Sequence, residues 1–208
     1  MPMFPLGSVL LPGSVLPLHV FETRYRQLVE DCLAGEPEFG VVLIERGREV
    51  GGGDTRTSVG SVARILEVLR LPDGRSGLTT VGTRRIRVLE WLADDPYPRA
   101  EVADWPDEDP AVVTTERVAT VGARVRRVLA LAAELGDTAP AVTTEVSDDP
   151  VLASYHLSAL SPLGPLDRLA LLAAPGPLER LDLLERLLDD VDEVLHFRLG
   201  APGAAGED

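Results

Sequence analysis

The sequence predicts an α+β protein, in which a small twisted β-barrel or folded sheet with one helix precedes an α-helical bundle. Before about residue 105 the apolar segments are short and separated by Gly and Pro turns, as in small β-rich folds. After residue 110 apolar residues recur every three or four positions, which is the period of an amphipathic helix. The acidic segment 106–110 separates the two patterns. We therefore expect a β domain over residues 1–105, a helical bundle over 111–197 and a flexible tail over 198–208.

In the first half, turn residues and apolar runs mark the strands. Residues 3–6 and 15–20 predict two strands, and Pro17 places the second at a sheet edge or a bulge. A helix is expected over residues 22–34, because its apolar side chains fall on one face and Gly35 follows. The remaining expected strands cover residues 39–45, 59–71, 77–80, 84–92 and 97–102, with a mobile loop or hairpin over 47–57. Alternation in residues 84–91 mixes Arg with apolar side chains on both faces, so the pattern does not decide which face is buried.

Four helices are expected in the second half. Three cover residues 112–135, 166–173 and 177–197, and another begins near Pro150 and is broken by Pro162 and Gly164. Asp148 or Asp149 caps this latter helix, and Pro150 suits its first turn. In the last helix Leu and Val alternate with acidic residues, and such a charge run is typical of a solvated helix face.

Charge and composition exclude several kinds of chemistry. All 20 basic residues are Arg, so the chain cannot provide the Lys of a Walker A loop or of a Ser–Lys peptidase. The net charge is −14, with 12 Arg against 15 acidic residues before residue 106 and 8 against 19 after it. This imbalance opposes nucleic-acid binding, which depends on clustered basic residues. Since only one cysteine is present and no secretory signal or membrane-length apolar run is seen, we expect a cytoplasmic protein.

No cofactor, metal or catalytic motif is predicted. The histidines His19, His156 and His196 are scattered without a ligand spacing, and no nucleophile or dinucleotide motif occurs. His19 lies in the apolar run LPLHVF, which favours a packed or hydrogen-bonded structural histidine over a catalytic one. Gly51-Gly52-Gly53 lacks the strand–helix context of a phosphate loop and is expected to be a flexible turn.

The opening segment FPLGSVLLPGSVLPLHVFETRYRQLVEDCL, residues 4–33, resembles the start of the Lon N-terminal substrate-binding family. Supporting parts are FGVV at 39–42, the PDGR turn at 72–75 and GTRRIRV at 82–88, in which Ile86 replaces the family's usual aromatic residue. The resemblance extends over about residues 3–197. It implies a PUA-like β domain followed by a helical bundle. We expect the ATPase and the Ser–Lys peptidase of full Lon proteases to be absent, because of the length of the chain and its lack of Lys.

The resemblance further implies a non-enzymatic adaptor that binds unfolded or degron-bearing polypeptides, with a protease as a further partner. No nucleic acid, membrane or cofactor is expected, and the oligomeric state is left open. An extended peptide could add to the strand interrupted by Pro17. The candidate polypeptide-binding residues are Leu16, Pro17, His19, Phe21, Arg24 and Tyr25. Phe21 and Tyr25 have a second interpretation, in which they only pack the helix onto the sheet. Two other functions stay open: an RNA-binding PUA-like protein, with Arg84, Arg85 and Arg87 as its basic cluster, and an uncharacterised hydrolase.

Overall fold

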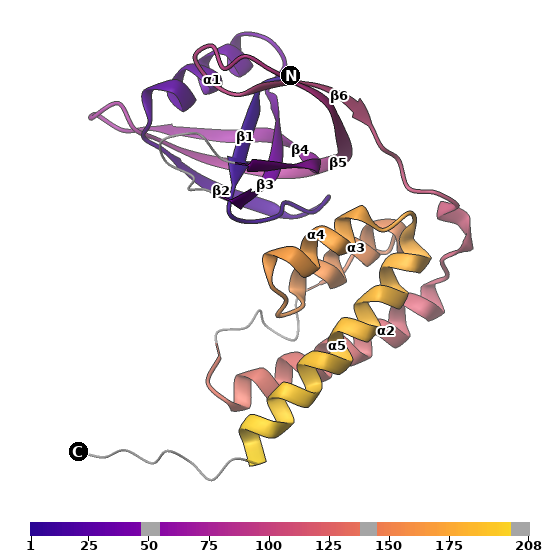
Figure 1. Ribbon diagram of the computed structural model, residues 1–208. Helices are drawn as coiled ribbons and strands as arrows, with labels where there is room; N and C mark the ends of the chain where they lie inside the picture. Colours follow the sequence, from indigo (N-terminus) through magenta and orange to yellow (C-terminus); the bar gives the residue numbers. More distant parts are fainter. Residues whose placement is uncertain (47–54, 138–144, 201–208) are drawn as a thin grey trace, which may run out of the picture.

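The computed structural model describes residues 1–46, 55–137 and 145–200, and within them the predicted α+β class is confirmed (Figure 1). A mixed sheet with one helix comes first, and four α-helices follow. The sheet is built from β1 (Met3–Leu6), β2 (Val15–Val20), β3 (Glu38–Arg46), β4 (Thr55–Arg70), β5 (Ser76–Leu92) and β6 (Arg99–Asp104). The helices are α1 (Thr23–Ala34), α2 (Thr115–Glu134), α3 (Pro150–Leu160), α4 (Pro165–Ala173) and α5 (Pro177–Gly200).

Two long strands hold the sheet together. Its order is β1-β3-β4-β5-β2, with β6 pairing separately with β5. β1 runs parallel to β3, and all other pairs are antiparallel. The start of β5 pairs with β2, whereas its second half pairs with β6. β2 stands at the end of the strand order, so within the described residues its only neighbouring strand is β5.

The prediction of two separate strands over residues 77–80 and 84–92 was wrong, because β5 is continuous. Gly82 lies inside β5, and a Cβ atom there would come within 2.4 Å of the Leu11 carbonyl oxygen. Gly82 therefore marks the place where the loop of residues 7–14 crosses the strand, and not a break in it. β4 also begins earlier than expected, at Thr55. The rest of the predicted loop, residues 47–54, lies outside the described residues.

The helix α1 covers one face of the sheet and completes its main core. The apolar side chains that predicted this helix are Tyr25, Leu28, Val29, Cys32 and Leu33. The first four are buried, whereas Leu33 is 39% exposed. The Tyr25 ring stacks on the Phe4 ring of β1 with a centroid distance of 4.0 Å. Burial raises the pKa of the only cysteine, Cys32, to about 11, so its thiol is protonated at neutral pH.

The boundaries of the helices depend on their capping residues. A short 3₁₀ turn, Pro110–Val112, precedes α2, which starts three residues later than predicted because the Thr114 side chain accepts a hydrogen bond from the Arg117 backbone N–H. Asp149 caps α3 as expected, by accepting from the Leu152 N–H. α5 runs to Gly200, so the first three residues of the predicted tail are helical. The other tail residues, 201–208, lie outside the described part of the chain.

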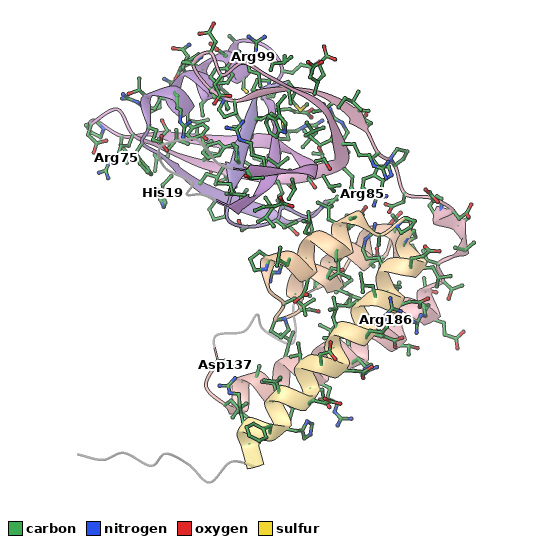
Figure 2. The ribbon with its side chains drawn as sticks, in the orientation of Figure 1. His19, Arg75, Arg85, Arg99, Asp137 and Arg186 are labelled. Atoms are coloured by element: carbon green, nitrogen blue, oxygen red, sulfur yellow. The ribbon has the colours of Figure 1, made fainter. Side chains whose placement is uncertain are left out.

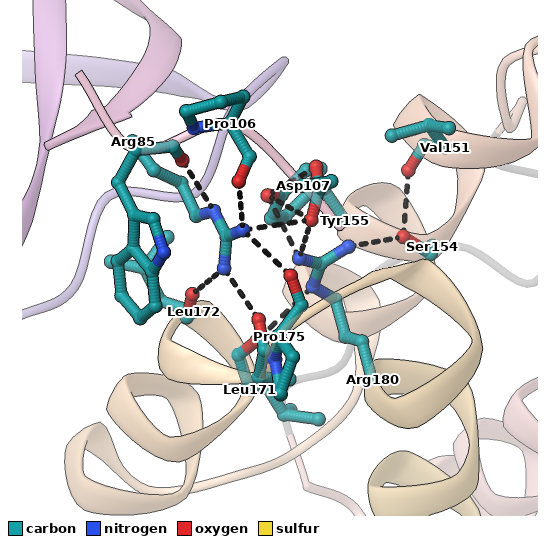
Figure 3. A network of polar contacts seen from close by, with 12 residues as sticks. Arg85, Pro106, Asp107, Val151, Ser154, Tyr155, Leu171, Leu172, Pro175 and Arg180 are labelled. Atoms are coloured by element: carbon teal, nitrogen blue, oxygen red, sulfur yellow. Dashed lines mark hydrogen bonds and ion pairs between the residues drawn. The ribbon is translucent and has the colours of Figure 1, made fainter. Parts of the chain in front are cut away.

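A buried polar network joins the sheet to the helices (Figure 3). The Arg85 side chain of β5 is 1% exposed and donates to carbonyl oxygens on both sides of the junction, those of Trp105, Pro106, Leu172, Ala174 and Pro175. Several of these carbonyls follow the last turn of α4, where backbone acceptors lack helical partners and the helix dipole favours a cation. Arg85 therefore caps a helix of the other half of the chain.

Asp107 is the carboxylate at the centre of this network. It lies 3.1 Å from the Arg85 guanidinium and 2.5 Å from that of Arg180, and it accepts a hydrogen bond from the Tyr155 hydroxyl at 2.9 Å. Arg180 is fully buried and also donates to the Ser154 hydroxyl. The segment predicted as a linker thus supplies a residue on which the junction depends.

The network also shows which face of residues 84–91 is buried, since side chains on both faces of this segment are covered. Ile86 is buried in a second cluster on one side of β5, while Arg85 is buried against the helices on the other. The three arginines considered for RNA binding therefore do not form one basic surface. Arg84 pairs with Glu38 and Asp104 at 2.7 Å and 2.9 Å, and Arg87 lies over the Trp105 ring.

Candidate functional site

The strand β2 is an edge of the sheet, which is the first of the two alternatives, edge or bulge, that Pro17 predicted. Among the strands that the structure describes it pairs only with β5, in an antiparallel register that sets Leu16 opposite Thr80. Just before the strand, the Gly82 N–H donates to the Ser14 carbonyl oxygen. In an antiparallel pair, hydrogen-bonded and non-hydrogen-bonded residues alternate. The even-numbered residues of β2 therefore bond to β5, and the odd-numbered residues direct their backbone groups to the free side.

This alternation identifies the groups on the free side of β2. They are the N–H groups of Val15 and His19 and the carbonyl oxygens of Val15, Pro17 and His19. Pro17 has no N–H, so the missing donor lies on the free side and the ladder with β5 is intact. Within the described residues, these groups make no backbone hydrogen bond outside the sheet ladders. Unpaired groups of this kind are a template for another extended chain.

The side chains of β2 also alternate. Leu16 and Leu18 are half-buried and pack on the main core, and Val20 is fully buried. Val15, Pro17 and His19 point to solvent. Of the two expectations for His19, a packed or a hydrogen-bonded structural histidine, the packed one was wrong, because the period-two alternation turns the side chain outward. In the view of Figure 2, His19 lies on the left of the sheet, whereas Arg85 lies on the right, next to the helices that follow the sheet.

A pocket of about 240 Å³ lies where β1, β2 and the start of α1 meet. Four predicted residues line it, namely Pro17, His19, Phe21 and Tyr25. The other lining residues are Phe4, Leu6, Leu18, Val20 and Glu22. Apart from His19 and Glu22, the lining consists of apolar and aromatic side chains, so the pocket suits an apolar group.

Phe21 and Tyr25 play different parts in this pocket. Tyr25 is 3% exposed and stacked on Phe4, so the packing interpretation holds for it. Phe21 is 54% exposed at the turn between β2 and α1. An aromatic ring that is half exposed beside an apolar pocket is available to a partner.

The two remaining predicted residues lie beside the pocket and do not line it. The side chain of Leu16 packs on the core next to Leu18. The Arg24 guanidinium lies 3.1 Å from the Glu22 carboxylate and 4.6 Å from the centre of the Tyr25 ring. Because Arg24 and Glu22 neutralise each other, this rim of the pocket carries no net charge.

Sequence reasoning missed the contribution of β1 to the site. Phe4 and Leu6 reach the pocket because the curled sheet brings β1 close to β2, although the two strands are not paired. The only signal in the sequence was the apolar FPL segment, which predicts a buried strand but not its neighbour.

A larger cleft of about 500 Å³ opens at the junction between the sheet and the helices. Its charged groups are already engaged with one another. Arg84 pairs with Asp104, and Arg85 and Tyr155 bind Asp107. We therefore regard this cleft as part of the junction and the edge of β2 as the candidate site.

The described part of the chain has neither a metal site of acidic, His or Cys side chains nor a membrane-spanning helix. In residues 1–46, 55–137 and 145–200, no group of three or more His, Cys, Asp or Glu side chains could hold a metal ion. Over the same residues, no helix is both long and apolar enough to cross a membrane.

Comparison with known sequences gives a consistent result. The family model described as the ATP-dependent protease La (LON) substrate-binding domain matches residues 1–190. The Lon protease of Anaeromyxobacter dehalogenans is 33% identical over 149 residues, covering 70% of this chain and 17% of that protein. Lon protease 2 of Herpetosiphon aurantiacus is 30% identical over 171 residues, covering 80% of this chain and 20% of that protein. The chain thus spans about a fifth of the length of these relatives.

Solved structures have the same architecture. A Lon N-terminal domain protein from Xanthomonas campestris superposes with a TM-score of 0.67 at 32% identity, covering 91% of this chain and 96% of that one. The N-terminal domain of the Mycobacterium avium complex Lon protease gives a TM-score of 0.61 at 20% identity, covering 91% and 97%. The second similarity concerns the fold alone.

Proposed function

We propose that this chain, which belongs to the family of Lon substrate-binding domains, is a non-catalytic module that binds unfolded or degron-bearing polypeptides in the cytoplasm. The proposal takes the binding surface to be the free side of β2 together with the adjoining pocket and Phe21. The observation that carries it is the unpaired edge of β2 beside an apolar pocket. Backbone groups on such an edge bind a chain of any sequence, and the pocket adds preference for apolar side chains.

The two halves of the chain have separate roles in this proposal. The β domain of residues 1–105 carries the binding surface, and the helical bundle of residues 111–197 supports its shape through the network around Asp107. The acidic side chains of α5 lie outside its buried stripe, and several pair with Arg117 or Arg124 of α2. A protease partner that receives the bound polypeptide completes the proposed role.

The test is binding of a labelled, permanently unfolded protein to variants of the full chain. Phe21→Ser is expected to weaken binding at least tenfold, because an aromatic side chain at the centre of an interface is worth more than about 1.4 kcal/mol. Leu16→Glu and Arg24→Glu are also expected to weaken binding, because each places an unpaired negative charge beside the apolar pocket. Circular dichroism identifies variants that stay folded. The Phe21 variant is the safest of the three, since half of its ring is already exposed.

A matched control lies on the helices. Reversing the charges of Asp189, Asp190 and Glu193 should leave binding unchanged. If the folded β2 variants bind normally and the charge-reversed chain does not, the proposal has chosen the wrong half of the molecule.

The absence of catalysis is tested separately. Purified protein should hydrolyse neither ATP nor casein, because the chain has no Lys and its single cysteine is buried with a raised pKa. Turnover that elutes with the protein from a sizing column would instead favour the hydrolase alternative.

A further inference from the structure

We propose that β2 binds its ligand as an added β-strand that always turns the same face toward the inward side chains of β2. The ligand is an extended segment with uncharged apolar side chains at every second position. This inference rests on the proposed function and deepens it, because it specifies which polypeptide segments are bound.

Hydrogen bonding along the free side of β2 sets the length of the segment that can bind. Val15 and His19 each offer an N–H and a carbonyl oxygen, whereas Pro17 offers a carbonyl oxygen only. Residues 15 and 19 are about 13 Å apart at 3.3 Å per residue, so a segment of five residues covers these groups. A strand lying alongside uses the backbone groups of every second residue only.

The side chains of a bound strand alternate between two faces, as those of β2 do. Those of an added strand continue the pleat of β2, so every second one extends the inward row of Leu16, Leu18 and Val20. This row borders the pocket formed with Phe4 and Leu6. At about 240 Å³ the pocket is smaller than the sites that bind drug-sized molecules, and we expect it to take one bulky apolar side chain.

The inward side chains of the ligand are expected to be uncharged. The inward row and the two β1 residues of the pocket are apolar, and the Glu22–Arg24 pair at the rim is neutral. A charged side chain placed inward would lose its hydration without gaining a partner. Side chains on the outward face remain in solvent beside Val15, Pro17 and His19, so they are unrestricted.

Pro17 argues against a second copy of this chain as the occupant. If two β2 strands paired antiparallel along their full length, the two Pro17 residues would face each other. Their two carbonyl oxygens would then lack donors at the centre of the pair, which is how proline protects sheet edges from self-pairing. A different chain can place an N–H opposite Pro17 and satisfy its carbonyl oxygen.

The experiment uses seven-residue peptides with three Leu at alternate positions and uncharged polar residues between them. Two versions carry backbone N-methyl groups, one on the Leu residues and one on the polar residues. N-methylation removes the N–H donors of one edge of the strand and leaves the other edge intact. Binding to the full chain is measured by fluorescence anisotropy.

Only one of the two methylated sets should lose binding, by at least tenfold, while the other stays within about twofold of the parent. The sensitive set reports the direction of the bound strand, because parallel and antiparallel addition present opposite sets to β2. A peptide of the same composition with its three Leu adjacent should bind at least tenfold more weakly than the alternating one. Equal effects of the two methylated sets, or equal binding of the two Leu patterns, would overturn the inference.

Pro17→Val supplies a test by gain of binding. The variant adds an N–H to the free side, and one hydrogen bond corresponds to an increase in affinity of about fivefold. Thr79→Val is the control, since Thr79 lies opposite Pro17 on β5, away from the free side. If Pro17→Val binds the peptide no better than this control, strand addition is wrong.

These results separate the inference from the proposed function. Loss of unfolded-protein binding in the Phe21→Ser variant, combined with equal effects of both methylated sets, would retain polypeptide binding and reject strand addition. Failure of wild-type protein to bind any unfolded protein or peptide would reject the proposed function itself.

Discussion

Replacing Asp107 by Asn removes the carboxylate that two buried arginines share. The Arg85 and Arg180 side chains are 1% and 0% exposed, and that of Asp107 is 11% exposed. Removing one member of a buried ion pair costs about 3–5 kcal/mol, because the remaining charge is left without its counter-ion. Arg85 keeps its carbonyl partners, so we expect a loss near the lower limit, about 3 kcal/mol.

Equilibrium unfolding in urea, followed by circular dichroism, measures this effect. With a slope near the upper end of the usual range, about 3 kcal/mol per M, the midpoint should fall by about 1 M. Glu108→Gln is the matched control, because Glu108 is the exposed neighbour of Asp107 and should change stability by less than about 0.5 kcal/mol. If Asp107→Asn shifts the midpoint no more than Glu108→Gln does, the network does not hold the two halves together.

Three further predictions follow from the same structure. Burial lowers the pKa of His156, whose Nδ1 accepts a hydrogen bond from the Ser147 N–H, so the free energy of unfolding should fall as the pH drops below about 6.5. In the His156→Gln variant the urea midpoint should depend less on pH between pH 7 and 5.5 than in the wild type. An equal pH dependence in both proteins would contradict this. Gly82→Ala should destabilise the fold by more than about 1 kcal/mol in urea unfolding, because its Cβ would clash with the Leu11 carbonyl oxygen; a neutral result would count against that close contact. Generic RNA should bind only weakly at physiological salt in an anisotropy titration, because Arg85 is buried and the net charge is −14; submicromolar, salt-sensitive binding would favour the RNA alternative.

Local features of the fold were predictable from the sequence. Asp149 and Pro150 identified the start of α3, since capping depends on residues within one turn. Pro17 identified β2 as an edge strand for a similar reason, because a proline cannot take part in two ladders. The helical period of the second half depends on spacing alone, and it predicted α2 to α5.

Features that depend on distant parts of the chain were not predictable. Gly82 suggests a break in a strand, and only the crossing loop at Leu11 explains why β5 continues through it. Arg85 has the appearance of a surface residue in a basic cluster, yet its partners lie about 20 residues away, around Pro106, and about 90 residues away, after α4. The burial of a charged side chain depends on such partners, which no local pattern reveals.

The candidate site was predicted in part. Four of the six residues line one pocket because they follow one another through β2 and the start of α1. The wall formed by Phe4 and Leu6 was missed, since it depends on the curvature of the sheet. The apolar neighbours of His19 favoured a packed or hydrogen-bonded structural histidine, but the alternation of the strand directs the side chain outward.

Site-specific photocrosslinking tests the central claim most directly. A photoreactive phenylalanine analogue replaces Phe21, beside the pocket, or Phe197, near the end of α5. The two rings are 54% and 78% exposed, so the control position is the more accessible of the two. With a labelled, permanently unfolded protein as client, crosslinks should form at position 21 and remain at background at position 197. Crosslinks at position 197 without any at position 21 would contradict the assignment of polypeptide binding to the free side of β2.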